Sequence, residues 1–146
     1  MKKIFFLLLL FVILVIMAIL IKKTNILSHQ NQYKDFRTIN YQLSTTNYKL
    51  LVADTPEKWE RGLMFFRKLK GVDGMIFLFP DKQPRTFWNK NTFIDLELSW
   101  INDDKIVGKS FLPSIEKSKE IVTVNSPSAV NKVIELLKLT NKEPAN

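Results

Sequence analysis

The segment Thr86–Trp100, TFWNKNTFIDLELSW, sets the expectation for the whole domain, because two different patterns meet within it. Its second half places Ile94, Leu96, Leu98 and Trp100 on one face and Asp95, Glu97 and Ser99 on the other. This alternation is typical of a half-buried β-strand. Its first half has Asn89, Lys90 and Asn91 directly after two aromatic residues, which allows a binding site, a turn or the polar face of a strand.

Further short strands are expected on both sides of this segment. The candidates are Tyr48–Ala53, Met75–Phe79, a hairpin around the turn Asn102–Lys105, and Glu120–Val124. Asp54–Gly62 predicts one short helix, since Thr55 can cap its first turn and Pro56 suits that turn. Residues 128–139 fit either a helix or a last strand. The pattern predicts a mainly-β fold, either a small barrel or a jelly-roll-like sandwich, with one short helix.

The N-terminal segment Ile4–Ile21 consists of eighteen consecutive apolar residues with a lysine pair on each side. As a helix it would span ~27 Å at ~1.5 Å per residue, which matches the core of a bilayer. We therefore expect residues 1–23 to be a transmembrane anchor, with a cleaved signal peptide as the alternative. The short basic N-terminus favours a domain on the extracytoplasmic side, whereas Lys22 and Lys23 favour the opposite orientation.

The rest of the chain divides into three parts by composition. Residues 24–46 are largely polar and predict a stalk, residues 47–139 predict the mainly-β domain, and residues 140–146 predict a tail. Four of the 22 basic residues flank the apolar segment, so 18 basic residues remain against 14 acidic ones, a net charge of +4. Because this weak charge includes no long run of one sign, we do not expect nucleic acid as a partner.

The composition argues against several common chemistries. The chain has no Cys and a single His, His29, which falls in the predicted stalk. Disulfides, the usual zinc sites and catalysis by His are therefore not expected. The sequence also lacks a phosphate-binding glycine loop, a dinucleotide fingerprint and a nucleophile elbow. We expect no metal and no cofactor, and the sequence favours binding over catalysis.

The densest candidate site is FWNKNT, residues 87–92. Trp88 offers a flat face for a sugar ring or a cation, Lys90 offers a charge, and Asn91 and Thr92 offer hydrogen-bond donors and acceptors. A continuous strand would place Trp88, Lys90 and Thr92 on one face. Asn91 would then lie on the other face, where it could instead be a buried residue that holds backbone groups in place.

Two further pairs of charged residues are candidates. Arg61 and Arg67 flank an apolar run and could clamp an anionic group, or they could form surface ion pairs. Asp95 and Glu97 lie two positions apart and could divide acid and base roles, as carboxylates do in glycosidases. On an open strand face, the same two carboxylates would only keep the surface soluble.

Three blocks of the chain carry a family resemblance. VADTPEKWERGLMFFRKL, GMIFLFP and FWNKNTFIDLEL occur in this order within residues 48–107. They resemble the signature of the domain of unknown function 192 family, whose members typically read RGLM-R, GM-F-F and FWMKNT--PLDI. This chain departs from the pattern at Asn89, Asp95 and Glu97, where the family usually has Met, Pro and Asp.

The resemblance implies a compact, mainly-β fold, often preceded by an export signal, and it implies no established activity. Carried over by position, the family's polar signature falls on Arg61, Arg67, Lys90, Asn91, Thr92 and Glu97. With Trp88, these residues form the expected ligand site of a membrane-anchored, extracytoplasmic binding module for an anionic or carbohydrate-like envelope ligand. The alternatives are an enzyme that acts on an envelope polymer through Asp95 or Glu97, and a structural or partner-binding module.

Overall fold

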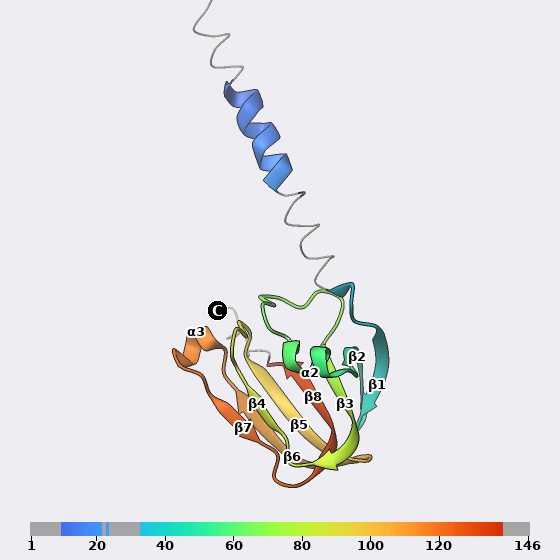
Figure 1. The fold of residues 1–146 in the computed structure, drawn as a ribbon. Helices are drawn as coiled ribbons and strands as arrows, with labels where there is room; N and C mark the ends of the chain where they lie inside the picture. The colour runs from blue at the N-terminus through green and yellow to red at the C-terminus, as the bar shows by residue number, and fades with distance from the viewer. Residues whose placement is uncertain (1–9, 22, 24–32, 139–146) are drawn as a thin grey trace, which may run out of the picture. The chain divides into compact units, whose positions relative to one another are not determined.

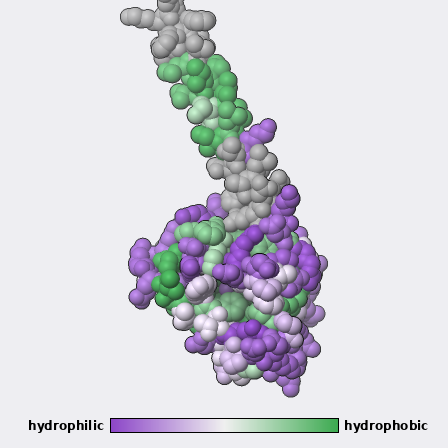
Figure 2. Space-filling view, in the orientation of Figure 1, coloured by the Kyte–Doolittle hydropathy of each residue, from purple (hydrophilic) through white to green (hydrophobic). Residues whose placement is uncertain are grey.

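The computed structural model describes residues 10–21, 23 and 33–138. The chain separates into two compact units, Met1–Asp35 and Phe36–Asn146. Within the first unit, residues 10–21 are helical (Figure 1) and apolar (Figure 2). Among the described residues, no helix has both the length and the apolar character needed to cross a membrane. Residues 4–9 of the expected anchor lie outside the described part of the chain.

The second unit is built on a six-stranded sheet in the order β1-β2-β3-β8-β5-β6, with a separate pair β4-β7 (Figure 1). The elements are β1 (Thr38–Leu43), β2 (Thr46–Ala53), α2 (Pro56–Arg61), β3 (Gly74–Gln83), β4 (Thr86–Trp88), β5 (Leu96–Asn102), β6 (Lys105–Leu112), α3 (Ile115–Ser118), β7 (Thr123–Asn125) and β8 (Val130–Leu137). Only β2 and β3 pair in parallel within these described strands. The prediction of a mainly-β fold is confirmed. The described sheet is open, with β1 and β6 at its edges, so these strands do not close a barrel.

The main sheet has apolar side chains on both faces. One face carries a buried cluster formed by Leu50, Val52, Ile76, Ile101 and Ile134. On the other face, Phe87 of β4 packs edge to face on Phe77 and Trp100, with ring centroids 4.8 and 5.5 Å apart. The β4-β7 pair therefore covers the face that carries Phe77, and the alternation predicted for residues 94–100 places Trp100 in this layer.

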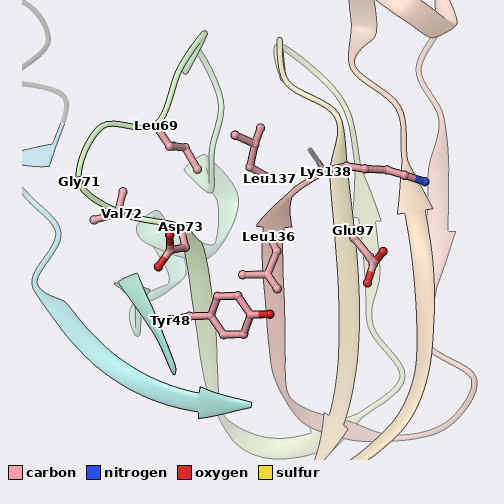
Figure 3. Close-up of a pocket in the computed structure, with 9 residues that line it drawn as sticks. All are labelled: Tyr48, Leu69, Gly71, Val72, Asp73, Glu97, Leu136, Leu137 and Lys138. Carbon is pink, nitrogen blue, oxygen red and sulfur yellow. The ribbon is translucent and has the colours of Figure 1, made fainter. Parts of the chain in front are cut away.

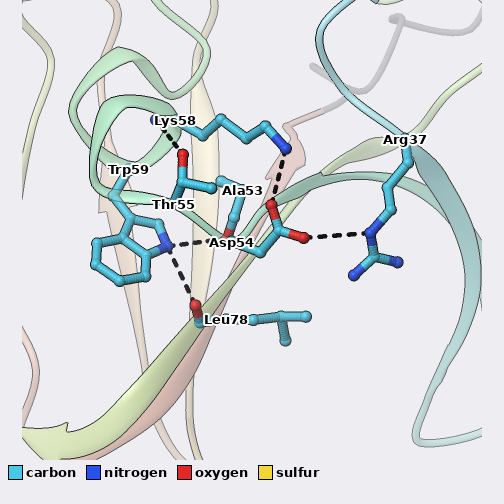
Figure 4. A network of polar contacts seen from close by, with 7 residues as sticks. All are labelled: Arg37, Ala53, Asp54, Thr55, Lys58, Trp59 and Leu78. Atoms are coloured by element: carbon cyan, nitrogen blue, oxygen red, sulfur yellow. Dashed lines mark hydrogen bonds and ion pairs between the residues drawn. The ribbon is translucent and has the colours of Figure 1, made fainter.

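The short helix α2 forms where the sequence predicts it and is held to the sheet by polar contacts (Figure 4). The Thr55 hydroxyl accepts the Lys58 N–H at 3.4 Å, and Asp54 pairs with Lys58 at 2.8 Å and with Arg37 at 3.2 Å. Trp59 Nε1 donates to the carbonyls of Ala53 and Leu78 at 3.0 and 3.1 Å. Trp59 thus joins the helix to both strands of the parallel pair, which compensates for a helix too short to be stable alone.

Gly74 permits the close pairing of β3 with β8. A Cβ atom at this position would lie 1.9 Å from the carbonyl oxygen of Glu135, a backbone atom that cannot move aside. Any other residue would therefore push β8 away from β3. This contact gives the glycine of the GMIFLFP block a structural role.

Two expectations need correction, one about where the domain begins and one about where a strand lies. The predicted stalk, residues 24–46, includes β1, which pairs with β2 from Thr38↔Leu51 to Leu43↔Thr46. Its Ile39, Tyr41 and Leu43 are half-buried in alternation, the same signal that identified other strands. The strand predicted at Glu120–Val124 lies closer to the C-terminus, since β7 spans Thr123–Asn125. The ambiguous residues 128–139 contain a strand, β8, which pairs with β3 and β5.

We expect Trp59→Phe to lower the free energy of unfolding by about 1–3 kcal/mol, because two carbonyls lose their donor while the aromatic packing largely remains. The measurement is equilibrium denaturation in urea. Trp88→Phe is the matched control, since Trp88 is 43% exposed, and it should change stability by less than about 0.5 kcal/mol. Equal effects of the two substitutions would contradict the role given to the Trp59 hydrogen bonds.

Candidate functional site

The segment FWNKNT is a strand end followed by a turn. Strand β4 stops at Trp88, and the Thr92 N–H donates to the Asn89 carbonyl at 3.0 Å. Asn91 has a positive φ of 55°, which a turn accommodates and a strand does not. The expected alternation of residues 88, 90 and 92 on one strand face is therefore wrong, and the segment forms a turn.

Asn89 is the residue that holds this turn to the rest of the domain. Its side chain is fully buried, and Nδ2 donates to the Pro113 carbonyl at 2.9 Å and to Ser118 Oγ at 2.8 Å. Its Oδ1 accepts the Val122 N–H at 2.8 Å. The scaffold role considered for Asn91 thus belongs to Asn89. Asn91 instead accepts the Phe65 N–H on its carbonyl at 2.8 Å.

The structure separates the predicted site residues into two groups. Arg67 pairs with Glu116 at 2.8 Å and lies 4.1 Å over the Phe93 ring, and Glu97 pairs with Lys109 at 3.1 Å. Lys90 is exposed and lies 5.0 Å over the ring of Trp88. Arg61, Trp88 and Thr92 line one small cavity, whereas Arg67, Lys90, Asn91 and Glu97 are not part of its lining.

This cavity has a volume of about 30 Å³ and lies where the three sequence blocks meet. Its lining consists of Trp59, Glu60, Arg61, Gly62, Leu63, Met64, Phe77, Phe87, Trp88, Thr92 and Glu135. All but the last of these come from the blocks VADTPEKWERGLMFFRKL, GMIFLFP and FWNKNTFIDLEL. Segments far apart in the chain therefore converge on one point, and Glu135 of β8 adds an acid that the blocks lack.

Glu135 is the residue of this site that the sequence did not reveal. It is 4% exposed, lies opposite Met75 and Leu98 on the neighbouring strands, and its Oε2 has no hydrogen-bond partner in the described structure. Burial raises the pKa of the Glu135 carboxyl to about 8, so the group is mostly uncharged at neutral pH. One local signal was present, because Glu135 is a single acid between Ile134 and Leu136 in an otherwise apolar run.

An aromatic cleft of about 330 Å³ adjoins the cavity. It is lined by Trp59, Phe77, Phe79, Pro84, Arg85, Thr86 and Phe87, and it shares Trp59, Phe77 and Phe87 with the cavity. The Arg85 guanidinium lies 4.0 Å over the Phe79 ring, and its Nη2 donates to Asp81. The buried Nε of Arg85 has no hydrogen-bond partner in the part of the chain that the structure describes. Sequence reasoning missed Arg85, which stands between a proline and the segment FWNKNT.

A larger groove of about 630 Å³ lies elsewhere, between the ends of β2, β3, β8 and β5 (Figure 3). It includes Tyr48, Asp73, Glu97, Leu136 and Lys138. Asp73 accepts the Lys49 N–H at 2.7 Å, and Lys138 extends away from the groove so that its Nζ lies 4.3 Å over the Phe111 ring. Its charged groups are therefore largely engaged by the domain itself, and we do not take this groove as the ligand site.

Asp95, considered as an acid or base, is occupied in holding the α3 segment. Its Oδ1 accepts the Ser114 N–H at 2.8 Å, and its Oδ2 pairs with Lys117 at 3.0 Å. Partial burial opposes ionisation, but these hydrogen bonds outweigh it and hold the pKa of Asp95 below its ordinary value. In the described residues, no three His, Cys, Asp or Glu side chains gather in a group that could hold a metal ion.

Comparisons with other proteins agree with this fold. The model of the DUF192 family, described as an uncharacterized ACR, matches residues 38–142. A candidate transcription regulator from Sinorhizobium meliloti 1021 is 30% identical with a TM-score of 0.53, over 70% of this chain and 78% of that chain. A protein of unknown function from Novosphingobium aromaticivorans is 20% identical with a TM-score of 0.52, over 72% of this chain and 84% of that chain, and this likeness concerns the fold alone. No curated protein matches the chain.

We expect Asn89→Ala to lower the free energy of unfolding by about 2–4 kcal/mol, because the partly buried Val122 N–H and Pro113 carbonyl lose their partner. Thermal and urea denaturation measure the effect. Asn40→Ala is the control, since Asn40 is exposed on the edge strand β1. A loss no larger than that of the control would show that the turn does not depend on Asn89.

The raised pKa of Glu135 predicts a pH-dependent stability. The ordinary pKa of Glu is 4.5 and the folded value is about 8, so the folded state binds the extra proton between these values and stability falls as pH rises through this window. From pH 5 to pH 8, the wild-type chain should lose about 2–4 kcal/mol more than Glu135→Gln, which cannot ionise. Urea denaturation at both pH values measures this, and parallel losses would contradict an uncharged Glu135.

Proposed function

The chain belongs to the DUF192 family of uncharacterized proteins, and from the geometry of its aromatic cleft we propose that it is a binding module for an acidic, carbohydrate-like ligand. The ligand lies against the aromatic rings of the cleft, and its acidic group pairs with Arg85. The module does not transform its ligand. We propose this cleft in place of the expected site, because Arg67 and Glu97 pair with Glu116 and Lys109. Lys90 lies over the ring of Trp88, outside the lining of the cleft.

The observation that carries this proposal is the unpartnered Nε of Arg85 at the cleft. The rest of its guanidinium is fixed by the Phe79 ring and by Asp81. A buried N–H without a partner is rare, because leaving it unpaired costs free energy. A carboxylate in the cleft would satisfy this donor, and a guanidinium that is already fixed loses little freedom on binding.

The aromatic side chains supply the second part of the recognition. Trp59 and Phe79 lie with their ring centroids 5.1 Å apart, and the indole N–H of Trp59 is already bonded to the backbone. The rings therefore offer apolar surface, while specificity must come from the few polar groups beside them. An apolar wall with few polar groups is the usual composition of small-molecule sites, and at about 330 Å³ the cleft has room for one sugar unit.

The charged groups support binding more than catalysis. Hydrolysis of a sugar polymer normally needs two carboxylates on opposite sides of the bond that breaks. Asp95 is held in its ionised form by Ser114 and Lys117, and Glu97 lies in an exposed pair with Lys109. Neither of them lines the cleft.

The location of the module is part of the proposal. The apolar segment 4–21 with flanking lysines supports attachment to a membrane, and its short basic N-terminus supports a domain on the extracytoplasmic side. An anionic polysaccharide of the cell envelope would then be the ligand within reach.

Titration of the full-length chain with D-glucuronate tests this function. Arg85→Gln should weaken binding about 10- to 100-fold, because a charge-assisted hydrogen bond is lost. Arg67→Gln is the matched control, since Arg67 also lies on an aromatic ring beside an acid but outside the cleft, and it should bind as the wild type does. Tryptophan fluorescence and calorimetry measure the affinity. If Arg67→Gln weakens binding and Arg85→Gln does not, the cleft is the wrong site.

A further inference from the structure

We infer that the cavity at Glu135 is a pocket for a single hydroxyl group, in which the Glu135 carboxyl hydrogen-bonds that hydroxyl. The inference rests on the proposed function of the neighbouring cleft and narrows its ligand class. A ligand that fills both places carries an acidic group for Arg85 and a hydroxyl group for Glu135, which describes a sugar acid better than an aromatic or aliphatic acid.

The size of the cavity restricts its occupant. A volume of about 30 Å³ is close to the share of one molecule in liquid water. The cavity therefore has room for one water molecule or one hydroxyl group and is too small for a sugar ring. Its lining includes the exposed residues Glu60 and Trp88, which indicates that it opens to the surface beside β4.

One of the residues that line the cavity, Glu135, has a polar atom without a partner in the described part of the chain. Glu135 is buried, and its Oε2 has no hydrogen-bond partner among the described residues. An unpaired buried oxygen costs free energy, so an occupant that bonds to it is favoured. As an acid with a pKa raised to about 8 by burial, Glu135 can both donate and accept at neutral pH, and a hydroxyl group can do the same.

The groups around Glu135 favour a neutral occupant. From the neighbouring strands β3 and β5 it faces Met75 and Leu98. From α2 the cavity receives Glu60 and Arg61, and from the turn after β4 it receives Thr92. The two charged residues have opposite signs, and the Arg61 guanidinium lies 4.6 Å over the ring of Phe36, which is not part of the lining. The lining therefore gives a charged group little advantage over a hydroxyl group.

The cavity and the cleft are close enough to serve one ligand. Trp59, Phe77 and Phe87 belong to the lining of both, so the two spaces adjoin. A ring lying on the aromatic wall can therefore direct its acidic group to Arg85 and a hydroxyl group past Phe87 to Glu135. The three blocks of sequence then supply the side chains that enclose this pocket, apart from Glu135.

Two probes of similar size distinguish the hydroxyl pocket from the cleft. D-glucuronate carries a carboxylate and several hydroxyl groups, and cyclohexanecarboxylate carries the carboxylate on a six-membered ring without hydroxyl groups. In the full-length chain at pH 7, Glu135→Leu should weaken glucuronate binding about 3- to 10-fold and leave cyclohexanecarboxylate binding unchanged. Glu135→Gln keeps a donor and an acceptor and should stay within about 2-fold of the wild type for both probes. Glu120→Gln, an exposed acid, is the control.

The outcomes separate the two proposals. If Arg85→Gln weakens both probes and Glu135→Leu weakens only glucuronate, both stand. If Arg85→Gln weakens both probes while Glu135→Leu weakens neither, or weakens both equally, the binding function stands and the hydroxyl pocket is wrong. If the wild-type chain binds neither probe, the binding function fails and the hydroxyl pocket fails with it.

Discussion

The pairing of β8 with β3 on one side and β5 on the other is the interaction on which the rest of the structure depends. Without β8, the strands β1, β2 and β3 form one sheet and β5 and β6 form another, with no backbone pairing between these two groups of described strands. The pairing requires that the backbone of β3 come very close to that of β8, which Gly74 allows. It also places Glu135 under the layer formed by α2 and β4, because alternate residues of a central strand face opposite sides of the sheet.

The functional geometry follows from this central position. A carboxyl on a central strand of a six-stranded sheet is buried, and this burial keeps it mostly protonated at neutral pH. The aromatic side chains of β3 and β4 and the helix α2 then close the space above it, leaving one cavity and one cleft. The cleft has its own charged residue, Arg85, which is fixed by its neighbours before any ligand arrives. The site is therefore largely preorganised, and a ligand adds the missing partners.

The sequence allowed most of the strands and the short helix to be predicted, because their signals are local. Alternation identified β5, turn residues identified the hairpin to β6, and the capping residue Thr55 identified α2. The polar turn at residues 89–92 could not be told from a strand, since Asn is common at positive φ but also occurs in extended segments. The site was harder, because Arg85 and Glu135 acquire their unusual character from burial among residues distant in the chain. Pairs such as Arg67 with Glu116, 49 positions apart, equally depend on tertiary contacts that no local pattern records.

The order of the strands also bears on how the chain reaches this fold. The strand that joins the two parts of the sheet is the last of the described strands to be synthesised, so the six-stranded sheet cannot be completed before it. Pairings between distant segments form slowly, because closing the long loop between them costs conformational entropy before their contacts can form. During synthesis, the backbone groups of β3 and β5 that pair with β8 therefore have no partner until residues 130–137 leave the ribosome. A chain of this topology has a built-in delay between the appearance of its N-terminus and the completion of its domain.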